Sequence, residues 1–185
     1  MQPSDAQLLL SCKRGEESAW EALINRYQRL IYAIPRRAGL DDDQAAEVFQ
    51  EVFATLFQKL HEIEEPDKIQ AWLVTTARRK TARLSAKIRR WRGSTESDED
   101  FDELENIPDQ SDLPDEVIAR LERQHQLRLA VQSLDERCRR LIELLYYQPQ
   151  PATYSEIAVK MGTNEGSIGP TRGRCLAKLL RLLKK

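Results

Sequence analysis

Acidic and basic residues are strongly segregated along this chain of 185 residues. Residues 68–95 contain nine basic and no acidic side chains, whereas residues 96–116 contain eleven acidic and no basic ones. The parts of the chain on either side also differ in sign: residues 1–67 carry a net charge of −6 and residues 117–185 a net charge of +7. The formal net charge of −1 is the small sum of these large opposite contributions. An acidic stretch with few apolar residues cannot bury enough surface to offset its chain entropy, so residues 92–114 are predicted to be a flexible linker. The rest of the chain then forms two folded parts, with basic surfaces suited to a polyanion.

Composition excludes several classes of protein. No stretch approaches the roughly 18 consecutive apolar residues of a membrane span, so no membrane insertion is expected. The three cysteines (Cys12, Cys138 and Cys175) are odd in number and far apart. This argues against a disulfide framework and predicts buried thiols, rather than redox sensors, in a reducing cytosol. His61 and His125 are isolated, so no metal site is expected. No cofactor is expected either. The sequence contains no evident nucleophile–base pair, so the protein is not predicted to be an enzyme.

Apolar residues repeat at helical spacing on both sides of the linker, which predicts an all-α fold of two small helical domains. The N-terminal domain, residues 1–91, should contain four helices. They are expected at residues 4–14, from Trp20 to an interruption at Pro35, from Asp41 to Ile63, and at 68–90. The C-terminal domain, residues 115–185, should contain helices at 115–132, 135–147, 154–161 and 165–183.

The strongest local motif lies in the C-terminal domain. Thr153 and Glu156 have the spacing of a capping box, and Gly162 permits a sharp turn after a short helix. Asn164 can cap a second helix that carries several basic residues. This order is typical of a helix-turn-helix, whose second helix can enter the major groove of DNA. An ordinary helical hairpin in a structural bundle is the alternative.

The N-terminal domain contains two patterns, a basic run and a polar stripe, and neither is specific for a function by itself. The basic run of residues 68–95 contains Trp72, and uncompensated charge beside an aromatic ring indicates phosphate contact and base stacking. A solvated helix face is the alternative. Glu47, Gln50 and Glu51 form a polar stripe that, by itself, is the solvent face of an amphipathic helix.

Combined, these motifs resemble a sigma factor of bacterial RNA polymerase, of the small two-domain extracytoplasmic-function type. The Glu47–Phe53 segment resembles the region-two helix of that family, which binds the clamp helices of the largest polymerase subunit. Ala71-Trp72-Leu73, followed by Ala77-Arg78, resembles the family's stretch at the −10 promoter element. Residues 154–179 resemble its region-four helix-turn-helix, which reads the −35 element.

The resemblance implies three sets of binding residues. Core polymerase would contact Glu47, Gln50, Glu51 and Phe53. The −10 DNA would contact Lys68, Trp72, Arg78, Arg79, Lys80 and Arg83. The −35 DNA would contact Ser167, Pro170, Thr171, Arg172, Arg174 and Lys178. The break at residues 61–68, with Lys68 and Ile69, aligns with the family loop that captures a flipped −10 base.

Some residues depart from the family pattern. Arg79 stands where the family has Asn, and Arg83 occupies a position that is commonly acidic. Both changes favour phosphate contact. In the recognition helix, Pro170 lacks an N–H and should either kink a helix that begins at Glu165 or mark a later helix start.

The implied function is that of a non-catalytic specificity subunit, which binds the β and β′ subunits of core polymerase and directs initiation at −35 and −10 elements. Its expected location is the cytoplasm, and the nucleoid within holoenzyme, and an anti-sigma factor is an expected partner. The alternative is a helix-turn-helix regulator with a helical dimerisation or sensor domain; a helical adaptor is a third possibility. The acidic linker is either a spacer or a competitor of nucleic acid for the basic helix of residues 78–92 or for the recognition helix.

Overall fold

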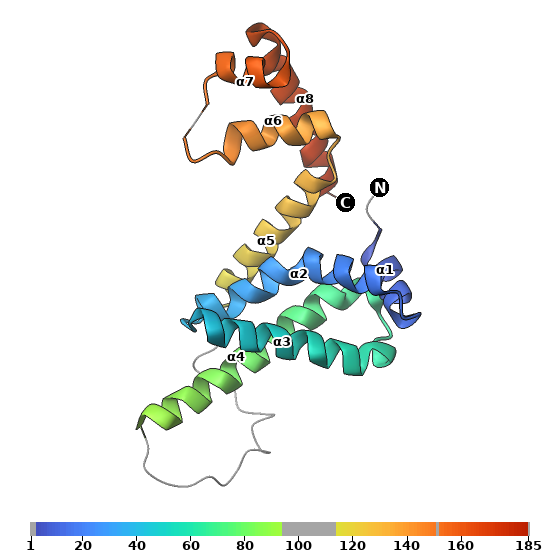
Figure 1. The fold of residues 1–185 in the computed structure, drawn as a ribbon, viewed down its shortest axis with the longest axis vertical. Helices are drawn as coiled ribbons and strands as arrows, with labels where there is room; N and C mark the ends of the chain where they lie inside the picture. The colour runs from blue at the N-terminus through green and yellow to red at the C-terminus, as the bar shows by residue number, and fades with distance from the viewer. Residues whose placement is uncertain (1–2, 94–113, 151, 185) are drawn as a thin grey trace. The chain divides into compact units, whose positions relative to one another are not determined.

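The computed structural model describes residues 3–93, 114–150 and 152–184, and these residues form helices and no strand (Figure 1). The all-α prediction is therefore confirmed for this part of the chain. The helices are α1 (Asp5–Lys13), α2 (Glu17–Arg37), α3 (Asp42–Lys59), α4 (Ile69–Gly93), α5 (Asp115–Gln132), α6 (Glu136–Tyr146), α7 (Tyr154–Met161) and α8 (Ile168–Leu183). Short 3-10 helices cover Leu60–Glu62, Pro66–Lys68 and Glu165–Ser167. The central residues of the predicted linker, 94–113, lie outside the described residues.

The described chain forms two compact units, residues 3–122 and 123–185, which meet within α5. Ile118 and Leu121, in the first half of α5, are buried in the core of the first unit. The Gln70 side-chain amide of α4 also donates a 3.2 Å hydrogen bond to the Glu122 carboxylate. The domain boundaries expected from composition, at residues 92 and 114, remain predictions.

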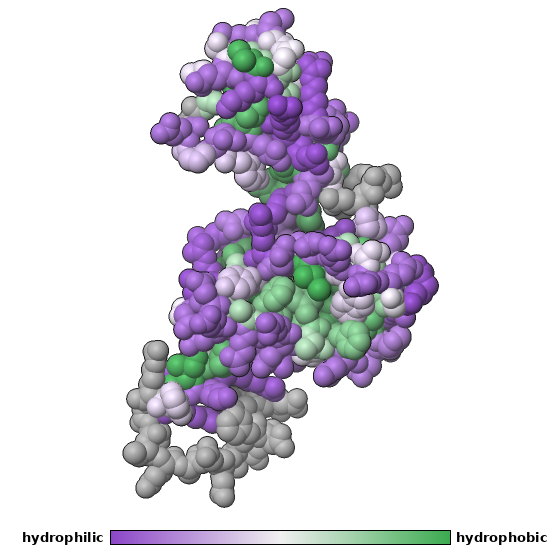
Figure 2. Space-filling view, in the orientation of Figure 1, coloured by the Kyte–Doolittle hydropathy of each residue, from purple (hydrophilic) through white to green (hydrophobic). Residues whose placement is uncertain are grey.

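In the first unit, α2, α3 and α4 pack against one another, and α1 lies against α2. Their shared core contains fully buried side chains from each of the three longer helices, including Leu23, Leu56 and Leu73. The buried Tyr27 hydroxyl donates a 2.6 Å hydrogen bond to the Asp5 carboxylate, which attaches α1 to α2. Hydrophobic residues also reach the surface over α2 and α3 (Figure 2), among them Phe57, whose ring lies 5.6 Å from that of Trp20.

The expectation that Pro35 ends the second helix was wrong. Helix α2 continues through Pro35 to Arg37, and Pro35 is buried among the core residues of the helix. Proline removes only its own N–H from the helical ladder, and here only two helical residues follow it. Burial of Ile34 and Pro35 together stabilises this last turn. Gly39, with a φ of +87°, then allows the chain to reverse toward α3.

The second unit is a smaller helical core in which α6, α7 and α8 meet. The Thr153–Glu156 capping box of α7 is present, and Gly162 ends the helix in the left-handed conformation, with a φ of +61°. The Asn164 carboxamide accepts a 2.9 Å hydrogen bond from the Ser167 N–H. These predicted features of the helix-turn-helix are confirmed.

Pro170 does not kink the last helix. A 3-10 turn, Glu165–Ser167, precedes α8, which begins at Ile168, so Pro170 is the third residue of the helix. The first-turn N–H groups of a helix have no carbonyl partner within it, so proline loses no bond at this position. The later helix start is therefore the correct alternative.

The expectation of unlinked thiols was wrong for two of the three cysteines. Cys138 of α6 and Cys175 of α8 form a disulfide, with 5.3 Å between their Cα atoms. Both lie on the buried faces of helices that pack together, so they are neighbours despite a sequence separation of 37. Closing a loop of this length stabilises a fold by roughly 3–4 kcal/mol through the unfolded chain. Cys12 is free and buried as predicted, and burial raises the pKa of its thiol to about 11.

Candidate nucleic-acid interface

The polar stripe predicted for polymerase contact lies on the outer face of α3. Glu47, Gln50 and Glu51 are exposed, because Val48 and Val52 of the same helix turn inward to the core. Their side chains are therefore available to a partner protein. Phe53, predicted with them, is only 8% exposed, and its ring packs in a tilted arrangement against that of Phe49, with 4.8 Å between the ring centroids. It supports the helix from within the core rather than presenting a contact surface.

The basic surface on α4 has an exposed and a paired part. Arg79 and Arg83 are exposed and have no ion pair among the described residues. Arg78 lies 3.0 Å from the Asp115 carboxylate at the start of α5, and Lys80 lies 3.1 Å from the Glu51 carboxylate of α3. The sequence did not indicate these two pairs, because each joins residues that are far apart in the chain.

Of the residues at the start of α4 and just before it, some are exposed and others are packed in the core. Lys68 is exposed and lies 2.7 Å from the Glu65 carboxylate, and the Trp72 ring is half-buried against the core. Ile69, aligned with the base-capturing loop, is completely buried. Its side chain is thus part of the core and is not exposed to stack on a flipped base. The preceding segment is held to α1 by a 2.9 Å hydrogen bond from the Lys13 ammonium to the Ile63 carbonyl.

Helix α8 turns one face inward and leaves its basic residues outside. The inward face carries Ile168, Thr171, Cys175 and Leu179, which repeat at helical spacing. Arg174 and Lys178 lie on the exposed side. Such a division is what a recognition helix requires, since the face opposite the core can approach a DNA groove.

Several side chains of this helix are held by hydrogen bonds within the unit. The Arg172 guanidinium donates to the Tyr154 hydroxyl at 2.9 Å, and the Arg174 guanidinium donates to the Thr171 hydroxyl at 3.2 Å. Thr171 is only 9% exposed, so it orients Arg174 and does not itself present a DNA-facing group. Ser167 is half-buried and hydrogen-bonds to Thr163 and Asn164, whereas Pro170 is exposed.

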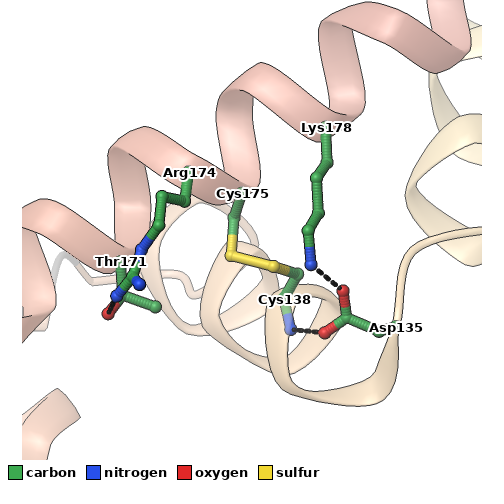
Figure 3. Close-up of a disulfide and its surroundings, with 6 residues drawn as sticks. All are labelled: Asp135, Cys138, Thr171, Arg174, Cys175 and Lys178. Carbon is green, nitrogen blue, oxygen red and sulfur yellow. Dashed lines mark hydrogen bonds and ion pairs between the residues drawn. A yellow bond between two sulfur atoms is a disulfide. The ribbon is translucent and has the colours of Figure 1, made fainter.

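Lys178 is fixed by a carboxylate from α6. Its ammonium lies 2.7 Å from Asp135, whose other oxygen accepts a 3.0 Å hydrogen bond from the Cys138 N–H and caps α6 (Figure 3). The hydrogen bond from Lys178 and the one from the backbone hold the pKa of Asp135 below its usual range. The sequence did not indicate the ion pair, because its two residues are 43 apart in the chain.

The described residues contain no cluster of His, Cys, Asp and Glu that could hold a metal ion. Within this same part of the chain, no helix has both the length and the apolar character needed to cross a membrane.

The exposed basic helices and the helix-turn-helix arrangement define a helical protein that binds nucleic acid. Comparison with known proteins specifies the family. Residues 23–93 match the family model described as Sigma-70 region 2, and this match covers α3, α4 and most of α2. The chain is also 26% identical, over 173 residues, to the RNA polymerase sigma-H factor of Pseudomonas aeruginosa; the alignment covers 90% of this chain and 87% of that protein.

Residues 23–93 therefore form a Sigma-70 region 2 domain, and over most of its length the chain is similar to a sigma factor of RNA polymerase. A sigma factor is a non-catalytic specificity subunit that directs promoter recognition by the polymerase.

Asp135 provides a test of the contacts that hold α8 to α6. We expect Asp135→Asn to keep the helix cap but lose the ion pair with Lys178, lowering the free energy of unfolding by at most about 1 kcal/mol at pH 7, as for other exposed pairs. Because the pKa of Asp135 is lowered in the folded state, the ion pair stabilises the protein above the unfolded pKa of about 4 and loses its effect as the pH falls below that value.

The difference in unfolding free energy between wild type and Asp135→Asn should therefore stay nearly constant from pH 7 to about 5 and shrink as the pH falls below about 4, as measured by urea denaturation. A difference that stays constant down to about pH 2 would contradict a role for the Asp135 charge.

Proposed function

We propose that this protein is a sigma factor of the extracytoplasmic-function type, whose two units divide the work of promoter recognition. The unit of residues 3–122 binds core polymerase and the −10 element, and the unit of residues 123–185 reads the −35 duplex. The observation that carries this division is the coincidence of the region 2 match with α2–α4, separate from a complete helix-turn-helix in the second unit.

On the first unit, α3 supplies the contact to the polymerase clamp. Glu47, Gln50 and Glu51 share one exposed face, and the buried residues of α3 fix the direction in which that face points. Neighbouring α4 supplies the −10 surface through Arg79 and Arg83, which offer exposed positive charge to phosphates. The Glu51–Lys80 pair connects the two surfaces.

On the second unit, Arg174 and Lys178 are the cations best placed for DNA. They project from the exposed side of α8 and are oriented by Thr171 and Asp135, respectively. Arginine forms paired hydrogen bonds with guanine in the major groove, so Arg174 is the proposed base-reading residue. Lys178 is proposed to contact phosphate, because a phosphate can replace the carboxylate of Asp135 as its partner.

The acidic linker is proposed to compete with promoter DNA in the free protein. Asp115 is the first residue of α5 and the second-last of the eleven acidic residues at 96–116, and it pairs with Arg78 on the proposed −10 surface. This pair supports competition by the C-terminal end of the acidic segment, which is the part of the segment that the structure describes. Five further acidic residues, whose neutralisation to Asn or Gln would also test the competition, lie outside the described residues: Asp98, Glu99, Asp100, Asp102 and Glu103.

The match to Sigma-70 region 2 weighs against the alternative of a helix-turn-helix regulator and against a helical adaptor, since neither accounts for it. An anti-sigma partner and a cytoplasmic, nucleoid-associated location belong to the same proposal. Contact with both the β and β′ subunits also belongs to it.

Promoter-selective transcription tests the proposed function. Core polymerase supplied with this protein should initiate at a subset of promoters in a selection from randomised −35 and −10 sequences. In the same assay, Arg174→Ala should lose about 1–3 kcal/mol of binding free energy and relax the preference at one −35 position. An equal loss on all sequences would instead identify Arg174 as a phosphate contact, and initiation without sequence preference would contradict the proposed function.

Glu51→Arg tests the polymerase surface. The exposed stripe on α3 should then repel the basic groups that it now binds, so we expect the affinity for core polymerase to fall about tenfold or more while helical content is unchanged by circular dichroism. Glu21→Arg makes the same charge change on the exposed side of α2 and serves as the control. Wild-type affinity in Glu51→Arg would contradict the assignment of this face.

Asp115→Asn tests whether the acidic segment competes with DNA. Removing one counter-charge of Arg78 should raise the affinity of the free protein for DNA by up to about fivefold at low salt, the range of an exposed ion pair. The gain should shrink above about 0.15 M salt, where such charges are screened. Glu116→Gln removes the same charge from the adjacent exposed position and should have a smaller effect. Equal effects of the two variants would indicate a general charge effect without specific competition.

A further inference from the structure

The disulfide of the second unit lies at the base of the proposed recognition helix. Cys175 is 1% exposed and occupies the inward face of α8, between Thr171 one turn before it and Leu179 one turn after it. Cys138 is 5% exposed and lies in the first turn of α6. The covalent bond therefore joins the inward face of α8 to the start of α6 (Figure 3).

The two cations proposed to contact DNA flank this bond. Arg174 directly precedes Cys175 in sequence, and Lys178 follows it by three residues. Lys178 pairs with Asp135, which also accepts the hydrogen bond of the Cys138 N–H. Figure 3 shows these side chains around the sulfur–sulfur bond. Any change in the spacing of α6 and α8 at the two cysteines would thus be transmitted to both cations.

The bond also closes a loop that contains the whole helix-turn-helix. The segment between the two cysteines, which are separated by 37 in sequence, includes the rest of α6, all of α7 and the start of α8. The apolar core that otherwise holds these helices is small, and the two cysteines themselves are among its eleven buried residues. The covalent bond is therefore a large part of what fixes α8 relative to α6.

We propose that Cys138 and Cys175 form a reversible redox site, whose oxidised state holds the recognition helix in its DNA-binding position and whose reduced state binds the −35 element more weakly. The proposal rests on the assignment of α8 as the recognition helix. The proposed reductant of the site is a dithiol, and the proposed oxidant is a disulfide of low molecular weight. The exchange itself requires no metal or other cofactor.

The exchange balances as two substitutions at sulfur. In oxidation, the Cys138 thiolate attacks a small disulfide, forms a mixed disulfide and releases one small thiolate. The Cys175 thiolate then attacks the Cys138 sulfur and releases the second, so two electrons pass to the small molecule and two protons leave the cysteines. Cys138 is the proposed first nucleophile because it is the more exposed and because the N-terminal turn of α6 favours a negative charge.

The direction of the effect follows from preorganisation. DNA must find Arg174 and Lys178 at a fixed spacing, and any freedom of α8 has to be lost on binding. In the oxidised state, the crosslink has already removed that freedom. In the reduced state, the Asp135–Lys178 pair and the small core are left to hold the helix, and the pair itself loosens when phosphate attracts Lys178.

The test uses the full chain in holoenzyme and needs no substitution for its main comparison. The wild-type protein is equilibrated in buffers of reduced and oxidised dithiothreitol at defined ratios, quenched with acid and alkylated after denaturation, and its thiols are counted by mass spectrometry. We expect one alkylated cysteine, Cys12, in the oxidised form and three in the reduced form. In the same buffers, the affinity for a duplex that carries a selected −35 element should fall five- to tenfold on reduction and recover on reoxidation.

Matched variants assign the response. Cys138→Ala/Cys175→Ala should bind equally in all buffers, at about the affinity of the reduced wild type, and any redox response of the polymerase core itself would appear there too. Cys12→Ala removes a buried thiol from the other unit and should respond as the wild type does.

Three alkylated cysteines in every buffer would overturn the proposal, and so would a disulfide that forms while the −35 affinity stays constant. If the wild type selects no −35 sequence in either redox state, the proposed function fails as well. If it selects one equally in both states, this inference alone fails.

Discussion

Burial of apolar side chains between α2, α3 and α4 is the interaction on which the first unit depends. Each helix contributes residues at three- and four-residue spacing, so each turns one stripe inward and is left with a polar stripe outside. The polar stripe on α3, which is proposed to bind polymerase, and the basic side of α4 are those outer stripes. Their positions are therefore consequences of core packing. A substitution in the core that rotated α3 would also move the polar stripe, even if the substituted residue made no contact with the residues of the stripe.

In the second unit, the helices are held together by a smaller apolar core. Its core has eleven buried residues, and a covalent bond between α6 and α8 supplements it. The ion pair of Asp135 and Lys178 and the hydrogen bond from Arg172 to Tyr154 add orientation at the surface. A recognition helix needs its cations at fixed spacing more than it needs a large core, and these contacts all act on that helix.

Charge compensation is a feature of both proposed DNA surfaces. Lys80 and Arg78 have carboxylate partners on the first unit, as Lys178 has on the second. Such exposed pairs contribute little to stability, but a phosphate must displace the carboxylate before it can bind the cation. If these surfaces bind DNA as proposed, the pairs lower the affinity for arbitrary DNA and favour sites where polymerase and base contacts add to the binding free energy.

Much of this molecule could be predicted from local sequence. The helices, the capping box at Thr153, the turn at Gly162 and the segregated charge depend on residues within a few positions of one another, so spacing alone indicates them. The orientation of individual side chains depends on contacts between distant segments. For this reason Phe53, Ile69 and Thr171 are buried although the sequence placed them in binding surfaces, and Pro35 is accommodated because the last turn of α2 packs. The disulfide shows the limit most clearly: cysteine number and spacing argued against it, and only the packing of α6 against α8 brings Cys138 and Cys175 together.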